Sequence, residues 1–143
     1  MATPISEPTW LDRPTVLAIH DELLAQHGGL AGVRDIGLLD SALGRPQHRW
    51  AYDEGVDLFE CAACYGFGIA KNHPFNDGNK RTAFQAMYTF LGLNGEQITA
   101  PDLDVVNVMV AVASGAMTEK KLADWLRSST AHRPRRRSSR RKT

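Results

Sequence analysis

Apolar residues recur every three or four positions along most of the chain, which is the spacing of one face of an α-helix. Prolines, glycines and capping residues divide this pattern into separate segments. The pattern predicts a mainly α fold, a helical bundle with at most a short strand or hairpin, because no long alternating segment occurs. We expect helices at 14–27, 35–43, 57–72, 78–92, 101–112 and 118–128, and a short strand at 96–99.

The segment 45–56 interrupts the helical pattern. Gly44 and Pro46 are expected to end the preceding helix, because proline lacks the N–H that an interior helical position donates. The residues that follow are mostly polar, so we expect an exposed loop. Its aromatic residues Trp50 and Tyr52 either contact a substrate or pack against the body of the protein.

Two of the expected helices have an unusual composition. The helix at 57–72 contains Gly66 and Gly68, and each glycine costs about 1 kcal/mol relative to alanine in a helix interior. We expect close packing against another helix to offset this cost. The helix at 78–92 is apolar over most of its surface, so we expect it to be the buried central helix.

Charge divides the chain into two parts. The chain has 143 residues with 17 Lys and Arg against 16 Asp and Glu, a length that suits one domain. Seven of the basic residues lie in 133–143, so residues 1–132 carry ten basic and 16 acidic side chains. We expect a folded domain at 1–130 and a basic disordered tail at 131–143, since the composition after Ser128 is mainly Arg, Ser and Pro. The tail either binds nucleic acid electrostatically or is a solubilising end without a partner.

The two cysteines, Cys61 and Cys64, are too few for a secreted domain held together by disulfides. Their CxxC spacing falls on an expected helix without a second cysteine pair, so we interpret them as small core residues rather than zinc ligands. No apolar run approaches the ~20 residues of a membrane span, and residues 1–10 lack the pattern of a signal peptide. We therefore expect a soluble, cytoplasmic protein without membrane contact.

The segment 73–81 concentrates polar chemistry between two apolar helices. Its sequence is His-Pro-Phe-Asn-Asp-Gly-Asn-Lys-Arg, and it ends in the first turn of the second helix. Unpaired N–H groups and the helix dipole favour anions there. Lys80 and Arg81 oppose the dipole, by roughly 0.3–1 kcal/mol each, and an anionic ligand reverses the sign of that effect. We infer a phosphate site formed by residues 78–81.

Three other residues complete this candidate site. Asp77 places a carboxylate beside the phosphates, which is typical of Mg²⁺ bound together with substrate oxygens, although the same residue also suits a helix N-cap. His73, as a neutral imidazole, can accept a proton from a hydroxyl. Phe75 is the one large apolar side chain in the loop, and we expect it to anchor the loop. Together these parts favour phosphoryl-type transfer, in which positioning and charge stabilisation provide most of the catalysis.

The string at 73–81 resembles the signature of the Fic family, which begins H-x-F-x-[DE]-[GA]-N-[GK]. Further similarity lies at 33–43, at 45–46 and at 63–72, and these segments resemble the Doc branch of the family, the death-on-curing toxins. The resemblance covers about residues 15–127. It implies the Fic fold, which is a mainly α helical bundle.

The resemblance also implies a role for each matched position. His73 is expected to deprotonate the target hydroxyl, and Phe75 is expected to hold the loop in place. Asp77 is expected to ligate Mg²⁺. The residues expected to bind the phosphates of ATP, or of another nucleoside triphosphate, are Gly78, Asn79, Lys80 and Arg81.

Two positions depart from the Fic proteins that transfer AMP. Lys80 stands where these proteins have a glycine, and Phe84 stands where they have a second arginine. A lysine crowds the path of the α- and β-phosphates, and the loss of an arginine removes a bidentate phosphate clamp. Doc toxins share both departures, bind the nucleotide in a reversed orientation and transfer its γ-phosphate. The resemblance therefore implies a serine/threonine protein kinase that inhibits translation, with elongation factor Tu as its target.

Two alternatives remain open, namely AMP transfer to a protein hydroxyl and a non-catalytic module that binds an antitoxin. The inhibitory motif S/T-x-x-x-E-G/N of many Fic proteins is absent, because Trp50 occupies the first position before Glu54-Gly55 and no other glutamate is followed by Gly or Asn. Inhibition is therefore expected from another chain. The Doc resemblance implies a type II toxin–antitoxin system with a Phd-like antitoxin, whose disordered segment folds onto the toxin. Nucleic acid would be contacted only through the basic tail or the antitoxin.

Overall fold

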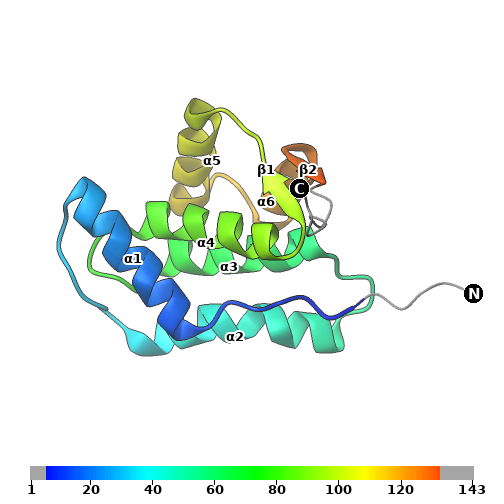
Figure 1. Ribbon diagram of the computed structural model, residues 1–143, viewed down its shortest axis with the longest axis horizontal. Coiled ribbons are helices and arrows are strands. Elements are labelled where there is room, and N and C mark those ends of the chain that lie inside the picture. The colour runs from blue at the N-terminus through cyan, green and yellow to red at the C-terminus, as the bar shows by residue number, and fades with distance from the viewer. Residues whose placement is uncertain (1–5, 133–143) are drawn as a thin grey trace, which may run out of the picture.

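The computed structural model describes residues 6–132, which form a bundle of helices with a small two-stranded sheet (Figure 1). This architecture confirms the predicted mainly α fold. No helix within these residues is both long enough and apolar enough to cross a membrane. In chain order, the elements are α1 (Arg13–His27), α2 (Ile36–Tyr52), α3 (Leu58–Asn72), α4 (Asn79–Leu93), β1 (Glu96–Ile98), α5 (Asp102–Ser114), α6 (Glu119–Ser128) and β2 (Thr130–His132).

Side-chain caps set the positions at which several helices begin. The carboxylates of Asp12, Asp35 and Asp57 each accept a hydrogen bond from a backbone N–H three residues later. Thr118 does the same at the start of α6. At α3, Glu60 also accepts from the N–H of Asp57, so the predicted capping box is present. Because these caps satisfy N–H groups that a helix leaves unpaired, they can be predicted from local sequence.

The central helix is α3 rather than α4, which corrects the expectation for residues 78–92. Nine residues of α3 are buried, against six of α4, and α3 packs against α2, α4, α5 and α6. A Cβ on Gly66 would collide with the sulfur of Met87, and a Cβ on Gly68 would lie 2.9 Å from the Cβ of Ala42. The glycines therefore let two neighbouring helices approach α3 closely, as the composition predicted.

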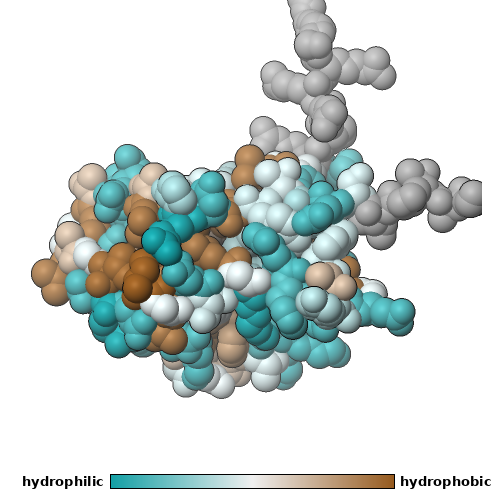
Figure 2. Space-filling view, turned by 90° about the horizontal axis from the view of Figure 1, so that it is seen from below, coloured by the Kyte–Doolittle hydropathy of each residue, from teal (hydrophilic) through white to brown (hydrophobic). Residues whose placement is uncertain are grey.

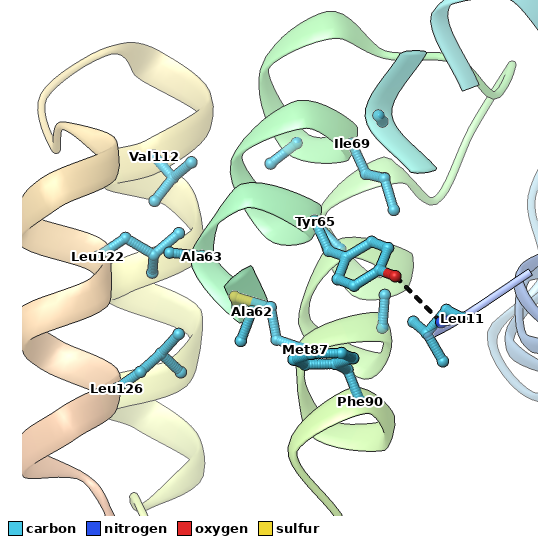
Figure 3. Packing of buried hydrophobic residues seen from close by; sticks show 14 of the residues in the cluster. Leu11, Ala62, Ala63, Tyr65, Ile69, Met87, Phe90, Val112, Leu122 and Leu126 are labelled. Carbon is cyan, nitrogen blue, oxygen red and sulfur yellow. Dashed lines mark hydrogen bonds between the residues drawn. The ribbon is translucent and has the colours of Figure 1, made fainter. Parts of the chain in front are cut away.

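The hydrophobic core lies between α3 and the helices around it, and it also holds the N-terminal segment. Figure 3 shows Tyr65 among the buried apolar side chains, where its hydroxyl accepts a hydrogen bond of 3.0 Å from the backbone N–H of Leu11. The ring of Tyr65 contacts that of Phe90 in α4, with centroids 5.1 Å apart. This one side chain therefore ties the segment before α1 to the centre of the bundle.

Both cysteines lie in this core, as their position on a helix predicted. Cys61 and Cys64 are fully buried, and each is a free thiol. Burial disfavours the thiolate, which raises the pKa of Cys61 to about 11 and that of Cys64 to about 12. Both thiols therefore stay protonated near neutral pH.

Helix α2 is longer than the sequence pattern predicted. It continues through Gly44 and Pro46 to Tyr52, so the expected loop at 45–56 is wrong for most of its length. Pro46 is buried. The burial and the packing around it offset the hydrogen bond that a proline cannot donate to the preceding turn.

Tertiary contacts hold the second half of α2 in place. Arg45 and Arg49 both donate to the carboxylate of Glu119 in α6, at 2.6 and 3.2 Å. Trp50 packs edge-on against Trp10, with ring centroids 6.3 Å apart. None of these contacts is local, so the pattern around the proline could not reveal them.

The two short strands pair close to the C-terminal end of the described residues. β1 and β2 are antiparallel and place Glu96 opposite His132. The strand predicted at 96–99 is confirmed. The disorder predicted after Ser128 is wrong as far as His132, because pairing with β1 supplies backbone hydrogen bonds that the local composition does not show, and the predicted boundary after residue 130 falls inside β2. The rest of the basic tail, at 133–143, lies outside the described residues.

Candidate active site

The candidate site is built on the loop 73–78, which joins α3 to α4 beside α1 (Figure 1). α3 ends at Asn72, as predicted, and His73 adopts the left-handed backbone conformation with a φ of 52°. This conformation costs roughly 1–3 kcal/mol for a residue with a side chain. The guanidinium of Arg34 stabilises it, because it donates to the carbonyls of His73 (2.7 Å) and Asn72 (2.8 Å).

Two residues fix the shape of this loop. Phe75 is only 1% exposed, which matches its expected place as the loop anchor. The side chain of Asn79 binds the backbone of Phe75 at both polar groups, accepting from the N–H and donating to the C=O at 3.0 Å each. The Asn79 side chain is therefore occupied within the loop, and its backbone N–H is the part available to a ligand.

The connection between α1 and α2 lies against the same loop. The backbone N–H of Asn76 donates to the carbonyl of Gly32 (3.1 Å), and its side chain donates to the carbonyl of Ala31 (3.0 Å). Val33 and Phe75 form an isolated antiparallel bridge. These contacts join two loops that are far apart in sequence.

Asp77 holds its carboxylate where the two loops meet. Its Oδ1 accepts from the N–H of Gly78 (2.9 Å), and its Oδ2 accepts from the N–H of Leu30 (3.1 Å). These backbone hydrogen bonds, first that of Leu30, lower the pKa of Asp77 below its ordinary value of 3.8, and the charge of Arg81 contributes in the same direction. The N-cap of α4 is Gly78, so the interpretation of Asp77 as that cap is wrong. Asp77 is an exposed, ionised carboxylate beside the start of the helix.

The start of α4 presents backbone donors and positive charge. Its N-cap, Gly78, has a φ of 75° and makes no side-chain cap hydrogen bond. The N–H groups from Asn79 onward therefore lack a capping side chain, and the helix dipole favours an anion beside them. Lys80 and Arg81 are exposed, and neither forms an ion pair within residues 6–132. Both cations are available to an anionic ligand.

A cleft of about 470 Å³ opens beside this helix start. Part of its lining is polar and consists of residues 77–81 and Gln85, together with His27. The rest is apolar and consists of Leu23 from α1, Phe84 from α4, and Val105, Val106, Met109 and Val110 from α5. The volume falls in the range of small-molecule sites. The lining suits a ligand with a charged part and an apolar part, as a nucleotide has.

His73 lies at the other end of the loop and does not line this cleft. Its imidazole is exposed rather than turned into the core. A side chain in this place is accessible to a molecule that approaches from solvent.

Trp50 and Tyr52 lie far from the candidate site. Tyr52 is about 24 Å along α2 from Ile36, at the ~1.5 Å rise per residue of a helix. Trp50 packs on Trp10, so the packing interpretation is confirmed for this residue. Tyr52 is exposed and contacts the ring of His48. Neither of the two aromatic residues lines the cleft.

Three supporting residues are missing from the sequence-based prediction of the site. His20 hydrogen-bonds to the carbonyl of Asp77 and stacks on Phe75. Arg34 binds the end of α3. Gly29 lies so close to Asp77 that a Cβ there would be 2.8 Å from a carboxylate oxygen. Of the three, only His20 stands out in the sequence, because it is a polar residue on the apolar face of a predicted helix. Spacing alone could not show that this face contacts the loop.

The residues around Asp77 fit a magnesium ion only together with a substrate. No group of three or more His, Cys, Asp or Glu side chains in the described part of the chain could hold a metal ion. Mg²⁺ commonly binds through one or two carboxylates, while phosphates and waters complete its coordination. Asp77 provides one ionised carboxylate beside the start of α4, which has no side-chain cap. The donor set therefore fits a magnesium–nucleotide complex.

The fold and the loop together define the class of protein. The model of the Fic/DOC family matches residues 10–91, and the chain belongs to this family. It is 41% identical to the protein kinase doc of Escherichia phage P1 over 113 residues, which are 78% of this chain and 88% of that relative. It is 46% identical to the toxin Doc of Mycolicibacterium smegmatis over 100 residues, which are 67% of this chain and 72% of that relative. The resemblance to the Doc branch is therefore confirmed.

Proposed function

We propose that this protein transfers a phosphate group from ATP to a hydroxyl of another protein. The observation that carries the proposal is the start of α4, which has no side-chain cap and lies between ionised Asp77 and the exposed cations Lys80 and Arg81. The adjoining cleft offers apolar contacts for a base and a ribose. Phosphate transfer requires mainly positioning and charge stabilisation from a protein, and these residues provide both.

Each residue of the loop has a part in this proposal. Asp77 would hold Mg²⁺, which neutralises phosphate charge when bound. His73, exposed at the far end of the loop, accepts the proton of the target hydroxyl. The hydroxyl oxygen then bonds to the γ-phosphorus as the bond from this phosphorus to the β-phosphate oxygen breaks and ADP leaves. Phe75 keeps the two ends of the loop at a fixed separation. The phosphates are bound by the backbone N–H of Asn79 and by the side chains of Lys80 and Arg81. Gly78, whose own N–H donates to Asp77, has no side chain to block their approach.

Two residues favour transfer of the γ-phosphate over transfer of AMP. Phe84 lines the cleft at the position where AMP-transferring Fic proteins have an arginine, and it offers no charge to the inner phosphates. Lys80 replaces a glycine in the first turn of α4, where its side chain takes space that those phosphates would need. The name of the relative from Escherichia phage P1, a protein kinase, supports this proposal. The proposed acceptor is a serine or threonine of elongation factor Tu, and the proposed consequence is inhibition of translation.

Label transfer tests the proposal directly. The protein is incubated with elongation factor Tu, Mg²⁺ and ATP labelled at either the α- or the γ-phosphate. We expect transfer from the γ position alone, and we expect His73→Ala to abolish it without loss of helical signal. His48→Ala is the matched control, because His48 is an exposed histidine outside the cleft lining. Transfer from the α position alone would support AMP transfer, and no transfer despite ATP binding would support a non-catalytic antitoxin-binding module.

The surface of α5 supports a second element of the proposal, regulation by a Phd-like antitoxin in a cytoplasmic type II toxin–antitoxin system. Leu103, Val106 and Val110 are 69%, 56% and 50% exposed, and their spacing forms one apolar stripe along the helix. Val106 and Val110 also line the cleft. A partner segment that folds on this stripe as an amphipathic helix would cover the cleft.

A second exposed apolar region lies on another face of the molecule. Figure 2 shows hydrophobic residues gathered toward the left of that face, at the end where α1 and the connection to α2 lie, while the right part is mostly hydrophilic. Leu30 and Ile36, from this connection and the start of α2, are 65% and 46% exposed. Co-expression tests which surface the antitoxin uses. We expect Leu103→Asp, which lies on the stripe but outside the cleft lining, to prevent relief of toxicity by the antitoxin, and Ile36→Asp is the matched comparison.

A further inference from the structure

We propose that His20 is a positioning residue that holds the phosphate-binding loop from a separate helix, an inference that rests on the proposed function. His20 lies in α1, 57 residues before Asp77, and it is only 2% exposed. It does not line the cleft. Any effect of His20 on a bound nucleotide therefore passes through the loop residues that it contacts.

The first contact is a hydrogen bond that defines which ring nitrogen carries the proton. Nε2 of His20 lies 2.8 Å from the backbone carbonyl oxygen of Asp77. A carbonyl oxygen only accepts hydrogen bonds, so Nε2 carries a proton and donates it. The bond fixes the peptide unit between Asp77 and Gly78, through which the chain enters α4.

The second contact is with the loop anchor. The rings of His20 and Phe75 are nearly parallel, at 10°, and their centroids lie 3.9 Å apart. Phe75 is bound in turn by the side chain of Asn79. One side chain of α1 therefore constrains the loop on both sides of Asn76, and the loop cannot shift relative to α1 without losing both contacts.

The direction of the Asp77 carboxylate depends on this support. Its two oxygens accept from the N–H groups of Gly78 and Leu30, so its position follows from the orientation of the peptide that His20 holds. The ring also packs near the turn itself, since a Cβ on Gly78 would lie 3.8 Å from Nε2. His20 thus sets the geometry in which Asp77 meets the magnesium–nucleotide complex.

Two substitutions separate the hydrogen bond from the packing. His20→Gln keeps an N–H donor at a similar distance from the backbone and loses much of the stacking. His20→Phe keeps a flat ring and loses the donor. His48→Phe is the matched control, because His48 also contacts an aromatic ring, that of Tyr52 with centroids 4.6 Å apart, but is exposed and outside the loop.

Two measurements are made on each variant of the full chain. Calorimetry gives the Mg²⁺ concentration at which ATP binding is half-maximal. Removing the support of a metal ligand typically lowers metal affinity about 10–100-fold, so we expect at least a tenfold higher Mg²⁺ requirement for His20→Phe and less than half of that change, on a logarithmic scale, for His20→Gln. NMR of the protein without nucleotide gives the hydrogen exchange of the Leu30 and Gly78 amides, which donate to the Asp77 carboxylate. We expect both amides to exchange faster in the variants, with the larger change in His20→Phe and the smaller change in His20→Gln.

The outcomes distinguish this inference from the proposed function. If His20→Phe leaves both the Mg²⁺ requirement and the two amides unchanged, the positioning role is wrong. Equal effects of His20→Gln and His20→Phe, accompanied by equal losses of thermal stability, also overturn it, because they indicate general packing. If the unsubstituted protein does not bind ATP with Mg²⁺, the proposed function fails, and the amide exchange still decides the role of His20.

Discussion

The side chain of Asn79 binds both backbone polar groups of Phe75, with Oδ1 accepting from its N–H and Nδ2 donating to its C=O, each at 3.0 Å. This reciprocal pair closes the loop onto the first turn of α4. The helix therefore begins at a fixed place although its N-cap, Gly78, offers no side chain. The donors that a cap would use remain available to a ligand.

Removal of this pair should destabilise the protein. We expect Asn79→Ala to lower the free energy of unfolding by about 1–3 kcal/mol, because two hydrogen bonds worth roughly 0.5–1.5 kcal/mol each are lost and the partners on Phe75 are left unpaired. Urea denaturation measures the change. Asn107→Ala, at an exposed position of α5, should stay within about 0.5 kcal/mol of the unsubstituted protein. Equal stability of the two variants would contradict the closing role of Asn79.

Lys80 should lower stability while it supports ligand binding. Its charge opposes the helix dipole in the first turn of α4, so Lys80→Ala is expected to raise the free energy of unfolding without nucleotide by roughly 0.3–1 kcal/mol. The same change should weaken ATP binding in calorimetry. Lys71→Ala is the matched control, since Lys71 lies in the last turn of α3, where a cation is favourable, and should give no gain in stability. Unchanged ATP affinity would show that Lys80 is not a phosphate ligand. Lower stability would contradict the expected effect of its charge on the helix.

The contribution of Asp77 to stability should depend on pH in a defined direction. Backbone hydrogen bonds hold its pKa below the ordinary value of 3.8. A carboxyl group with a pKa lowered by folding stabilises the folded state above its unfolded pKa, and this stabilisation is lost as the pH falls through the folded-state pKa. Asp77→Asn should therefore be less stable than the unsubstituted protein at about pH 6, and the difference should narrow below about pH 3.8. Urea denaturation over this range checks the trend, and a difference that does not vary with pH contradicts it.

Arg34 should affect the transfer rate more than nucleotide binding. It holds the carbonyls of Asn72 and His73 and does not line the cleft. We expect Arg34→Ala to lower the free energy of unfolding by about 1–2 kcal/mol and to slow label transfer, with little change in ATP affinity. Arg13→Ala is the control, because it removes an exposed ion pair with Asp40 that should be worth at most about 1 kcal/mol. If Arg34→Ala weakens ATP binding and leaves the transfer rate unchanged, this prediction is wrong.

The parts of the fold that could be predicted are those with local causes. The caps at Asp35, Asp57 and Thr118 act within three residues, so a short stretch of sequence contains each complete signal. The loop at 73–81 was recognisable because its charges conflict with the dipole of the helix that follows. Such a conflict points to a ligand without knowledge of the rest of the fold.

The parts that could not be predicted depend on contacts between distant residues. α2 continues past Pro46 because its later turns are held by Glu119 and Trp10, from other parts of the chain. The same limit applies to the support of the site, since Arg34 binds the loop across 39 residues and His20 across 57. Local spacing identified the residues of the candidate site and missed the residues that hold this site in place.

The burial of Cys61 and Cys64 has a practical consequence for labelling experiments. These are the two cysteines of the chain, and their raised pKa values keep them in the unreactive protonated form at neutral pH. A thiol introduced at an exposed position, such as Lys71→Cys at the end of α3, would then be the one site that a maleimide dye modifies. A fluorophore there would report movement beside His73 in a protein whose native residues are otherwise all retained.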